Sequence, residues 1–439
     1  MARFHVLLIG KGGREYAFLR KLLFSPEVFV TVAPGLTGML GLLDEDARSR
    51  VKLETKIKET DIKSINKLAQ EIKPDLTVIG PEDPTALGLA DELWNLGFKV
   101  FGFGKKYAQL ETSKSFCKEI YHAHGLPTAK AIVIRNKKEA SRELAKLRQK
   151  GQPIVLKSDG LALGKGVVIV SVDHPDYWGE NKKKISEMMD LSAPLGFVAK
   201  KVLLEHRYPI MNEWSAMHIV GPKRFWVPLM PTRDHKLFNG LNTGGMGIIA
   251  PAPEFTMADM ESRRRIPLIL QQSLQEENLM PFCGIIYEGL NRMLNTDYLV
   301  EINMRGGDPE TQGQFEFIQG LPFHELLLAA VEGKANVLKK IVISQNKALV
   351  GVVMASKGYP EYYQKGKEIM IPEILETLGM IFPSGLAWED GKFYTVGGRV
   401  LMAIGVADNI KEARSHAYII VNSISHQENL VFREDIGKI

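Results

Sequence analysis

Apolar and polar positions divide the first hundred residues into alternating strand and helix patterns. Residues 4–9 form a nearly continuous apolar run that ends at glycines, which is typical of a strand buried on both faces. A helical pattern follows over 15–23, and further strands are predicted over 28–32, 75–79 and 99–103. Strands separated by helices predict βαβ units and a doubly wound parallel sheet, with ligands at the carboxyl ends of the strands.

Beyond residue 107 the pattern becomes that of an α+β segment. A helix is predicted over 109–124, and a glycine-rich loop follows a strand that ends at residue 157. The segment 210–330 is predicted to hold a few strands joined by long helical stretches, and the last hundred residues read as a small α+β domain. The other predicted elements are strands over 131–134, 154–157, 166–170, 202–205, 215–220 and 298–302, and helices over 137–150 and 181–189.

A chain of 439 residues is too long for one hydrophobic core, because domains usually run to about 100–200 residues. The change of pattern predicts three domains: an N-terminal Rossmann-like substrate domain over 1–107, a central domain over 108–330 with a subdomain near 127–200, and a C-terminal α+β domain over 331–439. We therefore expect a multidomain fold of the α/β and α+β classes.

Charge and cysteine content narrow the class of partner. The formal net charge is +5, and the lysines and arginines are dispersed, so small phosphorylated molecules suit the chain and a nucleic-acid partner is not expected. Two cysteines are too few for a disulfide framework or a thiolate metal site. No apolar run approaches the ~20 residues of a membrane helix, and no leader pattern precedes the first strand. We expect a cytoplasmic protein with no membrane partner, either a monomer or a homodimer.

The first loop that could carry chemistry is Gly10-Lys11-Gly12-Gly13-Arg14-Glu15, between a strand and a helix. Its glycines would let backbone N–H groups approach an anion at the helix N-terminus, although the same loop also closes ordinary strand-to-helix turns. It is not a full G-x-G-x-x-G pattern, because the last position is Glu15, and no Walker A sequence occurs. A dehydrogenase is therefore disfavoured.

The second loop runs from residue 157 to 167 and joins two apolar segments. Lys157 and Lys165 flank three glycines, so the hairpin could fold over a triphosphate and supply positive charge. A flexible surface hairpin is the plainer alternative.

The third candidate is the stretch over 301–312. If the strand continues to Arg305, then Glu301, Asn303 and Arg305 alternate along it and share one face. A carboxylate and an amide oxygen suit Mg²⁺, and Arg305 could stabilise a phosphoryl group in transfer. A salt-bridged edge strand is the alternative.

The fourth candidate is Asp234-His235-Lys236, followed by a glycine-rich loop over 242–247. A polar turn before such a loop suggests a lid over a substrate. His235 could act as a general base, but a single loop histidine is more often a packing or hydrogen-bonding residue.

These four sites, in this order, resemble the phosphoribosylamine–glycine ligase family, also called glycinamide ribonucleotide synthetase, of the ATP-grasp superfamily. The resemblance covers nearly the whole chain and rests on many collinear motifs rather than one. The matching stretches lie at 12–15, 33–35, 80–82, 109–114, 159–167, 234–236, 242–247, 307–312, 351–355, 397–400 and 435–437.

The resemblance implies an ATP-grasp fold and a ligation of glycine to 5-phosphoribosylamine through glycyl phosphate, with ATP as co-substrate and Mg²⁺ or Mn²⁺ as cofactor. The implied ATP-binding residues are Lys114, Lys157, Gly160, Gly164, Lys165, Gly166, Glu205 and Glu213, and the metal ligands are Glu301 and Asn303. The implied substrate-binding residues are Gly12, Gly13, Glu15, Glu82, Asp234, Lys236, Asn242, Asp308 and Arg399, and the implied catalytic residues are Arg305, Lys157 and Asp308.

The chain departs from the family pattern mainly where the substrates are expected. Two alternatives therefore stand beside the purine ligase: an ATP-grasp ligase that joins another amine or acid, and a nucleotide-binding protein that has lost turnover. The second is disfavoured, because the metal and loop residues are retained. The departures are Lys11 for Asn, Tyr16 for His, Leu237 for Arg, Gly306 for Phe, Ala387 for Lys and Val396 for Asn.

Overall fold

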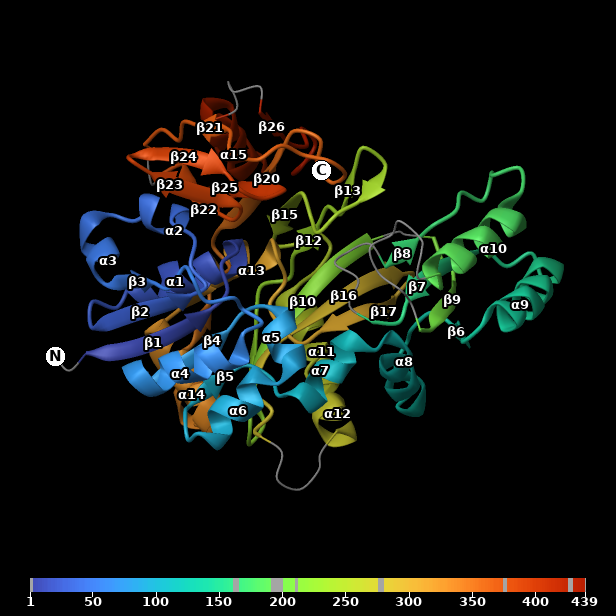
Figure 1. The fold of residues 1–439 in the computed structure, drawn as a ribbon, viewed down its shortest axis with the longest axis horizontal. Helices are drawn as coiled ribbons and strands as arrows, with labels where there is room; N and C mark the ends of the chain where they lie inside the picture. The colour runs from blue at the N-terminus through green and yellow to red at the C-terminus, as the bar shows by residue number, and fades with distance from the viewer. Residues whose placement is uncertain are drawn as a thin grey trace. The chain divides into compact units, whose positions relative to one another are not determined.

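The computed structural model describes residues 3–160, 166–190, 200–209, 212–274, 280–373, 377–424 and 429–438, and Figure 1 shows the course of the chain. The chain forms two compact units. Unit 1 comprises 1–107, 214–287 and 304–439, and unit 2 comprises 108–213 and 288–303. None of the described helices is long and apolar enough to cross a membrane.

Unit 1 begins with a parallel five-stranded sheet in the order β3-β2-β1-β4-β5. The predicted strands are confirmed, and β1 and β4 are buried along most of their length because helices cover the sheet on both faces. Helices α1 and α4 lie on opposite sides of the sheet in Figure 1. The bounds are β1 (Phe4–Ile9), β2 (Val28–Ala33), β3 (Val51–Leu53), β4 (Leu76–Ile79), β5 (Val100–Phe101), α1 (Gly13–Leu23), α2 (Gly38–Gly41), α3 (Glu45–Ser49), α4 (Ile62–Ile72), α5 (Glu82–Leu87) and α6 (Leu89–Asn95).

An antiparallel sheet in the order β12-β15-β20-β25-β22 occupies a later part of unit 1, and helix α15 packs on it. A second apolar core, separate from that of the parallel sheet, lies between α15 and the strands. The bounds are β12 (Arg233–Asp234), β15 (Gly247–Ala250), β20 (Ala348–Ser356), β21 (Glu368–Ile369), β22 (Gly379–Pro383), β23 (Leu386–Glu389), β24 (Lys392–Thr395), β25 (Arg399–Ala407), β26 (Leu430–Val431) and α15 (Ile410–Ile424).

The prediction of long helical stretches within 210–330 is wrong. Strands and hairpins fill much of this segment, and its described helices are at most ten residues long, because polar turn residues interrupt the segment often. One hairpin turns at Asn239 and Gly240, both at positive φ, which matches the Asn-Gly preference of two-residue hairpin turns. The bounds are β10 (Asn212–Gly221), β11 (Phe225–Pro228), β13 (Leu237–Phe238), β14 (Leu241–Asn242), α11 (Met257–Ser262), α12 (Arg265–Ser273), β16 (Gly284–Met293), α13 (Glu310–Gln314), β18 (Ile318–Gln319), α14 (Phe323–Glu332) and β19 (Val342–Ile343).

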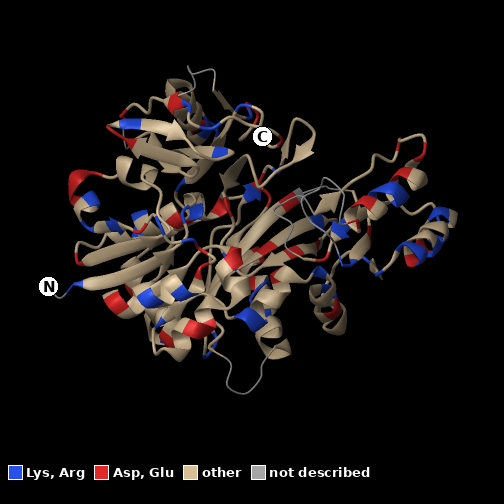
Figure 2. Ribbon diagram, viewed as in Figure 1, with Lys and Arg blue, Asp and Glu red and all other residues tan. Residues whose placement is uncertain are grey.

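Unit 2 contains an antiparallel sheet in the order β6-β9-β7-β8, with α9 and α10 packed together. Lysines and glutamates alternate along α10 in Figure 2, and Lys184 pairs with Glu187 at 3.0 Å, so the lysine run over 182–184 lies on a salt-bridged helix. The bounds are β6 (Ala131–Ile134), β7 (Ile154–Ser158), β8 (Val167–Val168), β9 (Val202–His206), β17 (Thr296–Asn303), α9 (Lys137–Gln149) and α10 (Tyr177–Met188).

Two predicted elements of this part need correction. The helix expected over 109–124 is two helices, α7 (Lys105–Thr112) and α8 (Lys114–Ala123). The chain breaks at Ser113, whose hydroxyl accepts a hydrogen bond from the Phe116 N–H and caps α8. The strand expected over 166–170 is shorter, because only β8 pairs with β7.

Candidate active site

A cavity in unit 2 gathers residues from α8, β7, β9 and β17. It measures about 40 Å³. Five of the residues predicted to bind nucleotide or metal line it together, although they are far apart in the sequence, so the structure brings these residues to one place. They are Lys114, Lys157, Glu205, Glu301 and Asn303.

A buried ion pair crosses this cavity. The Lys157 ammonium lies 2.8 Å from one oxygen of the Glu205 carboxylate, and the Lys118 ammonium lies 3.1 Å from the other. Burial opposes ionisation of Glu205, but the two ammonium groups outweigh it and hold its pKa below the usual value. Burial also lowers the pKa of Lys118. Two of the three lysines that line the cavity therefore share one carboxylate, and Glu111 and Glu301 line the same cavity.

The start of α8 is tied to the end of β7. The Asp159 carboxylate accepts hydrogen bonds from the N–H and the hydroxyl of Ser115, at 3.0 and 2.5 Å. The Lys114 ammonium donates to the Gly160 carbonyl at 3.3 Å, and Gly160 has a φ of +132° that favours glycine. These bonds fix the base of the predicted triphosphate loop. Gly166, at the far end of this loop, is among the described residues, whereas Gly164 and Lys165 are not.

Strand β17 carries the predicted metal ligands. Glu301 and Asn303 both line the cavity, and the negative charge of Glu301 acts on Lys114, whose pKa burial lowers and Glu301 raises. Glu288, on β16, is fully buried. Burial raises the pKa of Tyr121, and the charges of Glu288 and Glu301 raise it further. Among the described residues, no three His, Cys, Asp or Glu side chains group as a metal site.

Two predicted site residues, Arg305 and Glu213, do not line this cavity. The shared face does not extend to Arg305, because β17 ends at Asn303 and the chain bends at Met304 and Arg305. Glu213 is half-buried on β10 and does not line the cavity.

The loop before α1 in unit 1 is closed by its own glutamate. The Glu15 carboxylate accepts a hydrogen bond from the Gly12 N–H at 2.7 Å and pairs with Arg14 at 2.6 Å. Glu15 is buried, and a Cβ on Gly80 would collide with its carboxylate. A side chain on Gly13 would collide with Ser384 and Gln312. The loop glycines are therefore needed for close packing around Glu15.

Glu82 stands between two arginines. Its carboxylate lies 3.1 Å from Arg305 Nε and 3.6 Å from Arg14 Nη2. The Arg305 charge, opposed by burial and assisted by Arg14, lowers the pKa of Glu82 to about 2. The Arg14 guanidinium also donates to the Gly306 carbonyl at 3.2 Å. The structure thus places Glu82 and Arg305, both predicted site residues, in direct contact.

Asp308 and Arg399 form a second pair. Arg399 Nη2 lies 2.9 Å from an Asp308 carboxylate oxygen, and Nη1 donates to the Asp308 and Gly244 carbonyls at 2.7 Å each. Gln312 donates to the other carboxylate oxygen at 2.6 Å. Burial would raise the pKa of Asp308, but Arg399 and Arg14 lower it. Arg399 therefore connects the glycine loop over 242–247 to Asp308.

Asp234 and Glu310 bring two buried carboxyl groups together. Burial and the Glu310 charge raise the pKa of Asp234 well above its usual value, while Lys236 opposes the shift. Glu310 accepts a hydrogen bond from the Ser215 hydroxyl at 3.0 Å. Lys236 lies 5.9 Å from the centre of the Tyr287 ring. This part of unit 1 is therefore acidic, in contrast to the lysine-rich cavity of unit 2.

Asn242 and His235 are two further predicted residues, and the His235 backbone N–H donates a hydrogen bond to the Asp234 carboxylate at 2.6 Å. Asn242 is exposed on the hairpin strand β14. Burial, assisted by Arg433, lowers the pKa of His235 to about 4, and its Nδ1 lies 3.2 Å from the Gly247 carbonyl. A hydrogen-bonding role therefore fits His235 better than a general-base role.

The departures from the family pattern have different surroundings. Tyr16 points into the core and packs edge-on against Phe382, so it is a packing residue here. A Cβ at Gly306 would lie 2.5 Å from the Thr311 hydroxyl, which leaves little room for a larger residue. Lys11 and Leu237 are exposed, whereas Ala387 is buried on β23 and Val396 is half-buried.

Several site residues were missed by reasoning from the sequence. Lys118 lies four residues after Lys114 on one helix, a spacing that places both on one face and could have revealed it. Ser215 reaches the site only through the fold, whereas Glu310 and Gln312 lie in the candidate stretch over 301–312 but were given no role there.

Comparisons with known proteins find relatives that match nearly the whole chain. The family models for phosphoribosylglycinamide synthetase match its N domain over residues 4–111, its ATP-grasp (A) domain over 112–311 and its C domain over 349–439. The phosphoribosylamine–glycine ligase of Haemophilus influenzae is 35% identical over 447 residues, which cover 99% of this chain and 97% of that protein. The ligase of Clostridium acetobutylicum is 36% identical over 442 residues and 99% of each chain.

Solved structures agree with this assignment. The crystal structure of phosphoribosylamine–glycine ligase from Thermotoga maritima matches with a TM-score of 0.78 and 30% identity, over 98% of this chain and 100% of that one. The biotin carboxylase of Campylobacter jejuni matches in fold, with a TM-score of 0.71 and 14% identity over 99% of this chain and 94% of that one. The predicted fold class is confirmed. The chain belongs to the phosphoribosylglycinamide synthetase family and is an ATP-dependent ligase.

Proposed function

We propose that the protein joins glycine to 5-phosphoribosylamine at the expense of ATP. A glycine carboxylate oxygen attacks the γ-phosphorus of ATP, which gives glycyl phosphate and ADP. The amine of phosphoribosylamine then attacks the acyl carbon and loses a proton, and phosphate leaves, which gives glycinamide ribonucleotide. The relatives that match nearly the whole chain carry the name of this activity.

The observation that supports ATP binding most directly is the cavity of unit 2, where Lys114, Lys157 and Glu301 converge. We assign the two lysines to the phosphates and Glu205 to the neighbourhood of the base. A cavity of about 40 Å³ is smaller than a nucleotide. Binding of ATP must therefore displace side chains, and Lys157, now paired with Glu205, is the first that would move to the phosphates.

A divalent cation suits the donors on β17. Glu301 offers carboxylate oxygens and Asn303 an amide oxygen, and these are the hard ligands that Mg²⁺ or Mn²⁺ takes together with nucleotide phosphates. When bound, the ion would neutralise charge on the transferring phosphoryl group. Lys114 and Lys157 contribute positive charge to the same group.

In unit 1 we assign the substrates to the paired arginines and carboxylates. Arg305 is held by Glu82, and we assign it to the glycine carboxylate or the phosphoryl group. Asp308 is assigned to the amine of phosphoribosylamine, and Arg399 holds Asp308 and the glycine loop in place. Gly12, Gly13 and Glu15 shape the wall of this site, because the loop packs tightly around Glu15.

The acidic pair suits an ammonium group. Asp234 and Glu310 are buried together, so either one proton or one cation must relieve their repulsion. We assign these two carboxyl groups to the amino end of glycine, and we assign the Lys236 ammonium to an anionic group of the substrates. Asn242 on the nearby hairpin is assigned to the lid over the substrates.

ADP release with glycine and freshly made phosphoribosylamine tests the proposal against the alternative of another amine or acid. Other amines are tried in place of phosphoribosylamine, and other acids in place of glycine. We expect turnover only when glycine and phosphoribosylamine are both present. Turnover with a non-ribosyl amine alone would replace the proposed substrate. The cytoplasmic location, the absence of a nucleic-acid or membrane partner and the monomeric or dimeric state remain predictions.

A further inference from the structure

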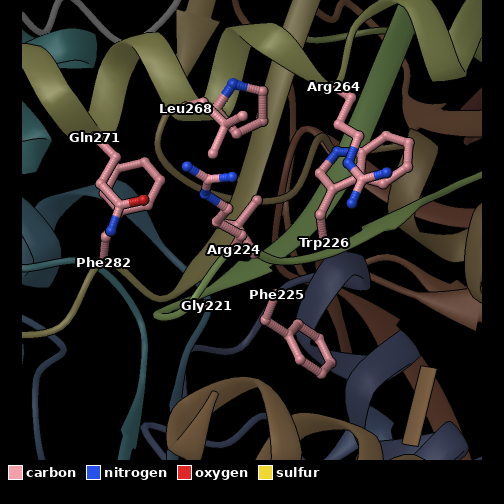
Figure 3. A pocket seen from close by; sticks show the side chains of 10 residues that line it. Gly221, Arg224, Phe225, Trp226, Arg264, Leu268, Gln271 and Phe282 are labelled. Atoms are coloured by element: carbon pink, nitrogen blue, oxygen red, sulfur yellow. The ribbon is translucent and has the colours of Figure 1, made fainter. Parts of the chain in front are cut away.

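A second cavity lies wholly within unit 1 and is lined by none of the residues assigned above. It measures about 130 Å³ and is formed by the turn between β10 and β11, by α12 and by Phe282. Figure 3 shows the side chains that line it, with the Phe225 ring turned away from the others. The apolar side chains of the lining are Val220, Trp226, Pro267, Leu268 and Phe282, and the polar ones are Arg224, Arg264 and Gln271.

The Trp226 ring is held in a fixed orientation. Its indole N–H donates a hydrogen bond to His218 Nδ1 at 3.2 Å, and His218 is fully buried on β10. The Arg264 guanidinium lies 5.3 Å from the centre of the Trp226 ring. The guanidinium covers this ring, and the His218 ring is stacked against it with the ring centres 5.8 Å apart, so a planar ligand in the cavity would stack on the Arg264 plane that covers Trp226.

Arg224 carries a charge that the described part of the chain does not neutralise, since no hydrogen bond or ion pair joins it to any described residue. Its backbone is unusual as well. Lys223 and Arg224 have φ values of +56° and +61°, which residues with a Cβ rarely adopt. Both residues lie in the turn of the β10–β11 hairpin, where positive φ is common, and this turn places Arg224 at the cavity. Among the described residues Arg264 forms an ion pair with Glu261 alone, at 3.4 Å and with both side chains more than half exposed, so a ligand can compete for it.

We propose that this cavity is a binding site for a nucleoside monophosphate. The base enters the cavity and stacks near Trp226, and the Gln271 amide, which can donate and accept hydrogen bonds, contacts the edge of the base. The phosphate stays at the rim, on Arg224 and Arg264. A cavity of about 130 Å³ is small beside the ~300–1,000 Å³ of drug-sized sites, so it suits one ring system with the sugar and phosphate outside.

Quenching of Trp226 fluorescence measures this binding. AMP, GMP and UMP are titrated into the full-length protein while ADP and Mg²⁺ saturate the cavity of unit 2, with ribose 5-phosphate and benzoate as matched ligands. We expect saturable quenching by at least one nucleotide, absent in Trp226→Phe. Ribose 5-phosphate tests whether phosphate alone suffices, and benzoate whether a planar anion without the nucleotide suffices.

Arg224→Gln should weaken nucleotide binding about tenfold or more, because it removes a charge-assisted donor. Lys223→Gln is the control, because Lys223 is a neighbouring exposed cation that does not line the cavity. The affinity of this variant for the nucleotide should stay within about twofold of that of the unmodified protein. Both variants should keep the basal ligase rate. Calorimetry repeats the titrations independently of the tryptophan. The proposal is overturned if no nucleotide binds, if ribose 5-phosphate or benzoate binds as tightly, or if Arg224→Gln binds as tightly as the unmodified protein.

Discussion

The polar clusters of the two units differ in how their charges are balanced. In unit 2, two buried lysines, Lys157 and Lys118, share the single carboxylate of Glu205. In unit 1, Glu82 and Asp308 are each paired with an arginine, and further carboxyl groups lie close by. The cavity of unit 2 is lined by three lysines and three glutamates, and two of the lysines share one glutamate, whereas Glu82 and Asp308 each have an arginine of their own. We expect the lysines of unit 2 to neutralise ligand phosphates once a cation occupies Glu301, and the pairs of unit 1 mainly to fix positions.

The largest effect is expected from the metal-binding strand. Glu301→Ala should reduce ADP release by about a thousandfold or more, because the ion contributes several kcal/mol to the phosphoryl-transfer barrier. Glu301→Gln keeps the shape of the side chain but is a weaker metal ligand. Its rate of ADP release should lie between those of Glu301→Ala and the unmodified protein. An unchanged rate in Glu301→Ala would remove β17 from the active site.

Breaking a partly buried pair in unit 1 should affect both activity and stability. Asp308→Asn leaves Arg399 without its carboxylate, and a hydrogen bond to a charged group is worth about 1.5–3 kcal/mol. We expect a fall in kcat/KM for the amine of about a hundredfold and a lower Tm. Glu54→Gln, which breaks the more exposed pair with Lys52, is the control. It should change neither the kcat/KM for the amine nor the Tm by much. Equal effects of the two variants would argue against a special role of Asp308.

Glu205→Gln is the corresponding change in unit 2. It removes the carboxylate that holds Lys157 and Lys118, and bonds to charged groups are worth about 1.5–3 kcal/mol each. The KM for ATP should rise about tenfold, whereas the KM for glycine should stay nearly constant. Initial-rate kinetics with each substrate varied in turn separate the two constants. A rise in the KM for glycine alone would contradict the assignment of ATP to unit 2 and of glycine to unit 1.

The Lys11 substitution is expected to have a smaller effect. Lys11 is exposed on the loop before α1 and replaces the usual Asn, so it can compensate for cations that the chain lacks at Leu237 and Ala387. Lys11→Ala should raise the KM for the phosphorylated amine severalfold and leave kcat unchanged. Lys63→Ala, an exposed lysine on α4, is the control. An unchanged KM in Lys11→Ala would end the compensation hypothesis.

Acid should weaken unit 1 through Glu82. Its pKa in the folded protein is about 2, below the ordinary 4.5, so its contribution to stability is complete above pH 4.5 and is lost as the pH falls towards 2. The difference in free energy of unfolding between the unmodified protein and Glu82→Gln should shrink across this window. Denaturant titrations at several pH values measure it, and a constant difference would contradict the assigned pair.

The parallel sheet and the loop after Lys157 could be predicted from the sequence because their signals are local, whereas Lys114 and Glu205 were expected at the site only from the family resemblance. An apolar run marks β1, and glycines between two lysines mark the loop after Lys157. The failures have physical causes as well. Ser113 caps a new helix where the periodicity continues, and the bend at Arg305 takes that side chain off the strand. The contact of Glu310 with Ser215 joins residues 95 positions apart, and no local pattern contains it.

The central claim is that the glycine carboxylate is phosphorylated before the amine attacks. Glycine labelled with ¹⁸O in both carboxylate oxygens, turned over with ATP and phosphoribosylamine, tests this directly by mass spectrometry of the released phosphate. The account predicts one ¹⁸O atom in each phosphate, because the attacking carboxylate oxygen leaves with phosphorus. Phosphate free of ¹⁸O, with both labelled oxygens lost to water or retained elsewhere, would contradict it.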